Sequence, residues 1–309
     1  MNALHDRLAD YLALRRTLGY KLVRPSIHLR QFVWWMDELG EQTVTIDRAL
    51  EWARLPAGAD PGYWADRLSA VRSFARYLHA LDPVNEVPPP DLLRHPSRRL
   101  TPYLYADQQI TALMAAAGRL RNPRLASTYQ TMIGLLAATG MRVGEAIALN
   151  LSDVHWEQRL LLIREGKFGK ARLVPLHAST FAALDAYMRE HRPGYPATGT
   201  PALFLNSYGR RVSHCNLSGT FHQLTTDAGI TPRSRLCRPR IHDLRHTFAI
   251  RTLLDWYRAG VDVQARLPLL STYLGHVNPA TTYHYLSAAP ELLALAGERL
   301  ERHLGADRS

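Results

Sequence analysis

A proline-rich segment divides this chain, and it limits every fold that the sequence can adopt. Residues 82–103 read DPVNEVPPPDLLRHPSRRLTPY, with three consecutive prolines at positions 88–90. Proline lacks a backbone N–H and clashes with the preceding turn, so no helix continues through this segment. We therefore expect two domains, residues 1–84 and 102–309, joined by a linker at residues 85–101. A chain of 309 residues is long enough for each domain to bury a core.

The first domain has the apolar spacing of helices throughout. We expect helices at about residues 3–17, 26–39, 45–52 and 61–80, with Thr45 as the cap of the third. Opposite the apolar stripe of the fourth helix stand three arginines, Arg67, Arg72 and Arg76. They form either a solvated helix face or a wall that contacts DNA phosphates, and the sequence leaves both interpretations open.

The second domain reads as mainly helical with one β insertion. Residues 160–163 and 171–176 are apolar segments on either side of a Gly/Lys turn, which predicts a β-hairpin. Gly140 is a natural stop for the helix before it, and Pro268 is expected to interrupt a later one. The expected helices lie at about 106–119, 124–139, 143–149, 178–191, 213–228, 242–259, 264–274 and 279–286. The fold class is therefore mainly α with a small β-hairpin or sheet.

The charge of the chain favours a polyanionic partner. The net charge is +11, and residues 1–99 hold 14 Lys and Arg against 12 Asp and Glu, so a surplus of nine falls in residues 100–309. A patch without any acidic residue runs directly into His242 and contains Arg233, Arg235, Arg238 and Arg240. These four are candidates for DNA contact.

Composition also excludes several classes of protein. There is no run of about 18 apolar residues, so we expect no membrane span. The N-terminus mixes Asp with Arg and is not a secretory signal. The two cysteines, Cys215 and Cys237, have no CxxC neighbour, which argues against disulfides or a cysteine zinc site. The cytoplasm is the expected location.

Six polar residues in the second domain form a set that suits phosphoryl transfer. Two guanidinium groups, an ammonium and two imidazoles can surround one phosphodiester and leave a phenol to attack it. Arginine suits this task because its planar fork grips two oxygens and stays charged. Glu145 follows Arg142 by three residues, on the same helical face, placed to hold its guanidinium; a purely structural ion pair is the simpler alternative. The six are Arg142, Lys167, His242, Arg245, His276 and Tyr285.

His242 and His246 also have the i, i+4 spacing of a metal-binding pair. The HEXXH pattern needs glutamate after the first histidine, whereas Asp243 stands there, and no third ligand is evident. We therefore expect no metal, and we assign His246 to packing or to support of the site.

The local sequences around the six residues resemble those of the tyrosine recombinase (phage integrase) family. They are Ala-Thr-Gly-Met-Arg142, Glu-Gly-Lys167, His242-Asp-Leu-Arg245-His-Thr-Phe, Leu-Gly-His276 and Thr-Thr-Tyr-His-Tyr285. The resemblance implies a SAM-like N-terminal core-binding bundle and a C-terminal integrase-type catalytic domain, which close around DNA as a clamp. The sequence YLALRRTLGYK near the N-terminus also resembles the core-binding domains of transposon-associated integrases.

The resemblance assigns a role to each residue. Lys167, with Lys170 as the runner-up, protonates the leaving 5′ oxygen, and His276 donates to a non-bridging oxygen. Tyr285 has the family's spacing for the nucleophile, and Tyr283 is the decoy two residues away. Either His242 or Lys167 accepts the phenol proton.

The resemblance also implies a reaction and its partners. Tyr285 forms a 3′-phosphotyrosyl intermediate on double-stranded DNA, with no ATP, metal or other cofactor. A homotetramer acts on two sites, with related recombinases or accessory proteins as further partners, and residues 290–304 form an amphipathic tail that docks on a neighbour or packs on its own domain. The alternatives are DNA relaxation like that of a type IB topoisomerase, and a catalytically silent architectural DNA-binding homologue.

Overall fold

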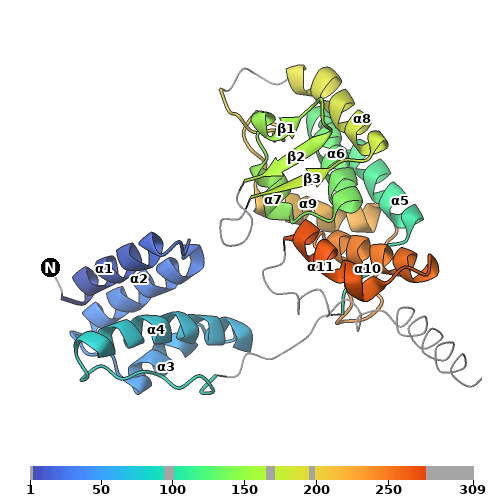
Figure 1. Ribbon diagram of the computed structural model, residues 1–309. Helices are drawn as coiled ribbons and strands as arrows, with labels where there is room; N and C mark the ends of the chain where they lie inside the picture. Colours follow the sequence, from blue (N-terminus) through green and yellow to red (C-terminus); the bar gives the residue numbers. More distant parts are fainter. Residues whose placement is uncertain (1–2, 94–100, 165–170, 195–198, 276–309) are drawn as a thin grey trace, which may run out of the picture. The chain divides into compact units, whose positions relative to one another are not determined.

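The computed structural model describes residues 3–93, 101–164, 171–194 and 199–275 (Figure 1). The chain forms two compact units, Met1–Arg98 and Arg99–Ser309, and each has its own hydrophobic core. It is mainly α-helical with one small antiparallel sheet, which confirms the predicted fold class. Each helix in the described ranges is too short or too polar to cross a bilayer.

The first unit is a bundle of four helices around buried aromatic rings that include Phe32, Trp52 and Phe74. The side chain of Thr45 accepts from the backbone N–H of Arg48 and caps the third helix, as predicted. The second helix starts at Val23, so Pro25 lies in its first turn. Proline is tolerated there because the backbone N–H groups of the first turn have no partner within the helix. The helices are α1 (Ala3–Thr17), α2 (Val23–Glu38), α3 (Ile46–Arg54) and α4 (Pro61–Leu81).

The described residues of the second unit form seven α-helices and a small sheet (Figure 1). In the sequence, the sheet comes after the third of these helices and before the fourth. The expected helix at 178–191 is α-helical only as far as Ala186 and continues as a π-helical turn, Tyr187–His191. The helices are α5 (Asp107–Gly118), α6 (Pro123–Thr139), α7 (Val143–Ala148), α8 (Ala178–Ala186), α9 (His214–Asp227), α10 (Asp243–Arg258) and α11 (Val263–Leu274).

Pro268 lies inside α11, and the expectation that it interrupts this helix is wrong. The missing N–H of Pro268 deprives the carbonyl of Gln264 of its helical partner. Both residues lie on the exposed face of α11, so water can bond to that carbonyl. The helix therefore runs unbroken to Leu274.

The sheet has three antiparallel strands in the order β1 (Val154–His155), β2 (Leu160–Ile163) and β3 (Arg172–Pro175). The predicted hairpin is β2 and β3, and β1 is an additional short strand. Leu161 lies opposite Val174, and both side chains enter the core of the second unit. Ile163 lies opposite Arg172, so an arginine stands at the end of the sheet where β2 ends and β3 begins. This end of β3 contacts α11, and α10 packs against both α6 and α11.

Candidate active site

Arg142 lies at the junction of α6 and α7. The chain leaves α6 through Gly140, whose φ of 60° is left-handed and confirms the predicted stop. A side chain at this position would also overlap the ring of Phe248 on α10, so glycine is what lets the two helices approach. Two residues later Arg142 occupies the cap position of α7.

Glu145 binds Arg142 twice, through the main chain and through the side chain. The backbone N–H of Arg142 donates to Oε2 at 2.9 Å, and its Nη1 donates to Oε1 at 2.8 Å. Arg172 on β3 approaches the same carboxylate with two parallel bonds, Nη1 to Oε1 at 3.0 Å and Nη2 to Oε2 at 2.7 Å. The Glu145 side chain is 5% exposed, so its charge is neutralised almost entirely by these two arginines.

The surroundings of Glu145 keep it ionised. Burial alone raises the pKa of its carboxyl, but the hydrogen bonds and charges of Arg172 and Arg142 outweigh burial and hold the pKa at about 2. The ordinary value is 4.5, so the folded state favours the carboxylate more strongly than the unfolded chain does.

We expect Glu145→Gln to lower the free energy of unfolding at pH 7 by about 3 kcal/mol, because it leaves two arginines without their carboxylate. The folded pKa lies below the unfolded one, so the contribution of Glu145 is fully present above about pH 4.5 and is lost as pH falls towards 2. Urea denaturation of the full chain, followed by circular dichroism, should show the gap between wild type and variant closing between these values. A gap of equal size at pH 7 and pH 3 would contradict this account.

Arg245 lies in the first turn of α10 and is almost completely buried, with 2% of its surface exposed. Its Nη1 donates to the carbonyl of Gly140 at 2.9 Å, and its Nη2 donates to the carbonyl of Leu274 at 2.7 Å. The guanidinium therefore joins the end of α6 to the end of α11, and its orientation is fixed from both sides.

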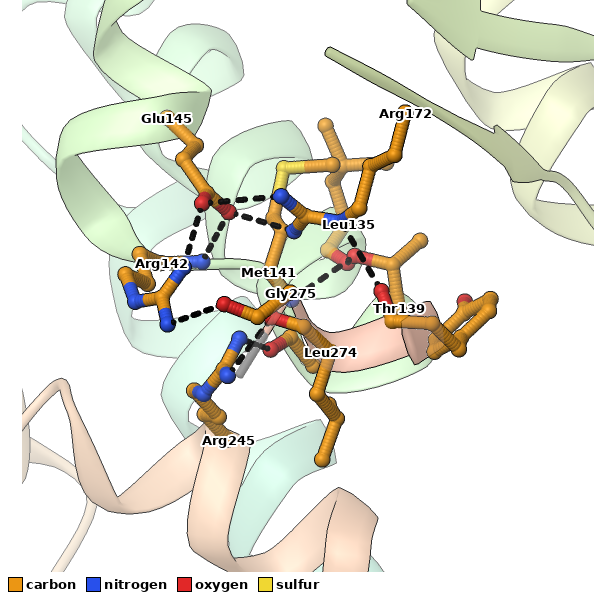
Figure 2. A network of polar contacts seen from close by, with 11 residues as sticks. Leu135, Thr139, Met141, Arg142, Glu145, Arg172, Arg245, Leu274 and Gly275 are labelled. Carbon is orange, nitrogen blue, oxygen red and sulfur yellow. Dashed lines mark hydrogen bonds and ion pairs between the residues drawn. The ribbon is translucent and has the colours of Figure 1, made fainter. Parts of the chain in front are cut away.

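The C-terminal end of α11 brings three arginines together (Figure 2). Arg172 Nε donates to the carbonyl of Tyr273 at 2.8 Å, and Arg142 Nη2 donates to that of Gly275 at 2.8 Å. With Arg245 on Leu274, three successive carbonyl groups each accept from a different arginine. These carbonyls have no partner within the helix and form the negative end of its dipole, which favours cations there. The resulting cluster of positive charge suits a phosphate.

His242 stands beside Arg245 at the start of α10, with part of its surface exposed. The protein around the rest of the ring desolvates the imidazolium and, with the charge of Arg245, lowers the pKa of His242; Asp243 opposes this shift. The neutral ring is therefore favoured near pH 7, which suits a hydrogen-bond or proton acceptor. The ring of His246 contacts it edge to face, with centroids 5.0 Å apart. Within the described ranges, no three His, Cys, Asp or Glu side chains are placed to hold a metal ion.

Arg172 is the site residue that sequence reasoning missed. The sequence places Arg172 in the second strand of the expected hairpin and indicates no role for it, although a lone arginine in the otherwise apolar segment 171–176 is a signal for one. Its partner Glu145 precedes it by 27 residues, so no local spacing connects the two.

Three of the six predicted catalytic residues, Lys167, His276 and Tyr285, lie outside the described residues. So do Lys170, Tyr283 and residues 290–304. Of the other three, Arg142 and Arg245 meet at the end of α11, Glu145 holds Arg142, and His242 lies beside Arg245. His276 directly follows Gly275, the last described residue, whose carbonyl accepts from Arg142.

The three arginines of α4 do not share one exposed face, and the placement of Arg67 is a correction. Arg67 is 6% exposed, stacks 3.6 Å above the ring of Trp52 and donates to that residue's carbonyl. It is part of the core of the first unit and is not available to DNA. Arg72 donates to the carbonyls of Pro88 and Pro89 and ties the proline segment to α4. Only Arg76 is exposed as expected.

The arginines before α10 differ in exposure and in partners. Arg240 is partly buried and pairs with the fully buried Asp243. Arg233, Arg235 and Arg238 are exposed, and Arg233 also donates to the carbonyl of Leu104. Arg235 and Arg238 line a pocket of about 330 Å³ between α9 and the segment before α10.

Comparison with known sequences identifies close relatives. Residues 103–291 match the model of the phage integrase family. The chain is 40% identical over 308 residues to a putative integrase/recombinase, y4rB, of Sinorhizobium fredii, with 98% of each protein covered. It is 35% identical over 229 residues to the tyrosine recombinase XerD of Mycobacterium tuberculosis, covering 72% of this chain and 68% of that protein.

Solved structures share the fold at lower identity. The Tn1549 transposon integrase in complex with transposon right end DNA matches with a TM-score of 0.65 and 18% identity, covering 98% of this chain and 99% of that one. The XerH site-specific recombinase bound to a palindromic difH substrate matches with a TM-score of 0.60 and 19% identity, covering 92% and 79%.

Proposed function

Because the chain belongs to the phage integrase family and is a tyrosine-type site-specific recombinase, we propose that it cuts and rejoins DNA through a covalent bond to Tyr285. The observation that carries this proposal is the meeting of Arg142 and Arg245, which lie on separate elements, at the end of α11 beside His242. Such a group of fixed positive charges is what a phosphoryl-transfer transition state requires.

In the proposed reaction the phenol oxygen of Tyr285 attacks the scissile phosphorus. The new Tyr–O–P bond forms as the bond from phosphorus to the 5′ oxygen breaks, and the phosphate stays on the 3′ end. His242 or Lys167 accepts the phenol proton, and Lys167 protonates the leaving 5′ oxygen. Arg142, Arg245 and His276 stabilise the charge on the non-bridging oxygens. The 5′ hydroxyl of a partner duplex then reverses these steps, so neither ATP nor a metal ion is needed.

Double-stranded DNA is the proposed substrate, with Arg76 of the first unit and Arg235 and Arg238 of the second on backbone phosphates. Their exposure supports this role. Two further proposals concern assembly: four copies act on two sites, and residues 290–304 dock on a neighbouring copy. The structures of Tn1549 integrase and XerH in complex with DNA support double-stranded DNA as the substrate by shared fold.

The experiment that tests this function needs a DNA site, which repeated binding and recovery from a random duplex library supplies. A supercoiled plasmid with two copies of that site, incubated with the protein and EDTA, is expected to yield deletion or inversion products. A plasmid without the site is the matched control and should remain supercoiled. Relaxation of both plasmids would instead indicate a topoisomerase, and tight site binding with no strand exchange would indicate an architectural protein.

A further inference from the structure

The contacts of Arg172 extend beyond the proposed catalytic set. We infer that Arg172 is a positioning residue for strand cleavage: it holds Glu145, and through Glu145 it fixes Arg142 against the scissile phosphate. This inference rests on the proposed function, because it takes Arg142 as a phosphate-binding residue.

The first step of the inference is that Arg172 orients the carboxylate that holds Arg142. The carboxylate contacts Arg142 at two atoms, but Arg142 stays partly open, with 25% of its side chain exposed. Arg172 donates two parallel hydrogen bonds, at 3.0 and 2.7 Å, to the same carboxylate, and its side chain is only 11% exposed. A bidentate arginine fixes both the position and the plane of a carboxylate. Glu145 is thus oriented by Arg172 and in turn orients Arg142.

The second step is that Arg172 is itself anchored where the site is built. Its Nε donates to the carbonyl of Tyr273, two residues before the end of the described chain. Its guanidinium lies so close to Gly275 that a Cβ there would come within 2.8 Å of Nη1, and Gly275 has a left-handed φ of 69°. Arg142 donates to the carbonyl of this same Gly275. Strand β3, α7 and the end of α11 are therefore fastened to one another through two arginines and one glutamate (Figure 2).

The third step is that lysine cannot replace Arg172. One ammonium group cannot reach both oxygens of Glu145 and the carbonyl of Tyr273 in the flat arrangement that the guanidinium fork provides. Arg172→Lys preserves the charge beside Glu145 and loses this geometry. It therefore separates an electrostatic role from a positioning role.

The test measures single-turnover formation of the covalent protein–DNA adduct at saturating protein, together with the dissociation constant for the same duplex. We expect Arg172→Met to slow adduct formation by about ten- to a hundredfold, as when the supporting partner of a functional group is removed. Arg172→Lys should show a smaller but clear loss, and both should leave DNA affinity within about threefold, since one indirect contact is lost among many. Arg164→Met is the matched control, because Arg164, directly after β2, also pairs with a buried carboxylate, that of Asp153. All variants are compared at a temperature at which circular dichroism shows them folded.

A double-mutant cycle identifies the route. If Arg172 acts through Glu145, Arg172→Met should cost much less in the Glu145→Gln background than in the wild type. NMR of the arginine side chains provides a readout that does not depend on the reaction: in Arg172→Met, rotation of the Arg142 guanidinium should become faster.

The outcomes separate the two proposals. A normal adduct rate in Arg172→Met, an equal loss in both backgrounds, or an unchanged Arg142 signal would overturn the inference. A wild-type protein that forms no adduct on its selected site would contradict the proposed function, while the NMR comparison still decides whether Arg172 positions Arg142.

Discussion

Arg245→Lys is expected to slow strand cleavage by about a thousandfold, the upper end of what loss of one oriented charge donor costs an enzyme. The guanidinium of Arg245 is buried and is oriented by the carbonyls of Gly140 and Leu274, which lie on either side of it. A lysine ammonium cannot span both carbonyls and also meet a phosphate oxygen in a fixed direction. The charge therefore survives this substitution, and the geometry that makes it useful is lost.

The measurement is the rate of adduct formation on a nicked duplex, with DNA affinity measured in parallel. Affinity should change little, because one phosphate contact is lost among many. Arg258→Lys is the matched control, since Arg258 lies on the same helix and forms an exposed pair with Asp255. Cleavage by Arg245→Lys at the wild-type rate would contradict the assignment of Arg245.

Tyr285→Phe is expected to abolish the covalent adduct completely. Phenylalanine removes only the phenol oxygen, so packing and DNA binding should persist while the nucleophile is lost. Tyr283→Phe is its natural control, because it makes the same chemical change two residues away and should preserve the adduct. If Tyr283→Phe loses the adduct and Tyr285→Phe retains it, the nucleophile has been assigned to the wrong tyrosine.

The parts of the fold that could be predicted are those set by local chemistry. Thr45 caps α3, Gly140 ends α6, and the two apolar segments of the predicted hairpin pair as β2 and β3. Each depends on a few adjacent residues. Pro268 was misjudged because a proline on the exposed side of a helix costs one hydrogen bond that water can replace.

The arginines show which contacts cannot be predicted from the sequence alone. Arg67 follows Trp64 by three residues and precedes Val71 by four, so it borders the apolar stripe of α4, but only the folded bundle shows that it stacks on Trp52. Arg142 and Arg245 were predicted from the motifs around them. Arg172 was not, because its partners, Glu145 and Tyr273, lie far from it in the sequence and meet it only at the end of α11.

The most direct test of the central claim is to identify the residue that carries DNA. Wild-type protein is incubated with EDTA and a nicked suicide duplex containing its selected site, the adduct is digested with protease and nuclease, and the peptide that retains a nucleotide is sequenced by mass spectrometry. We expect a 3′-linked nucleotide on Tyr285. A nucleotide on any other residue, or no adduct on a site that the protein binds tightly, would contradict it.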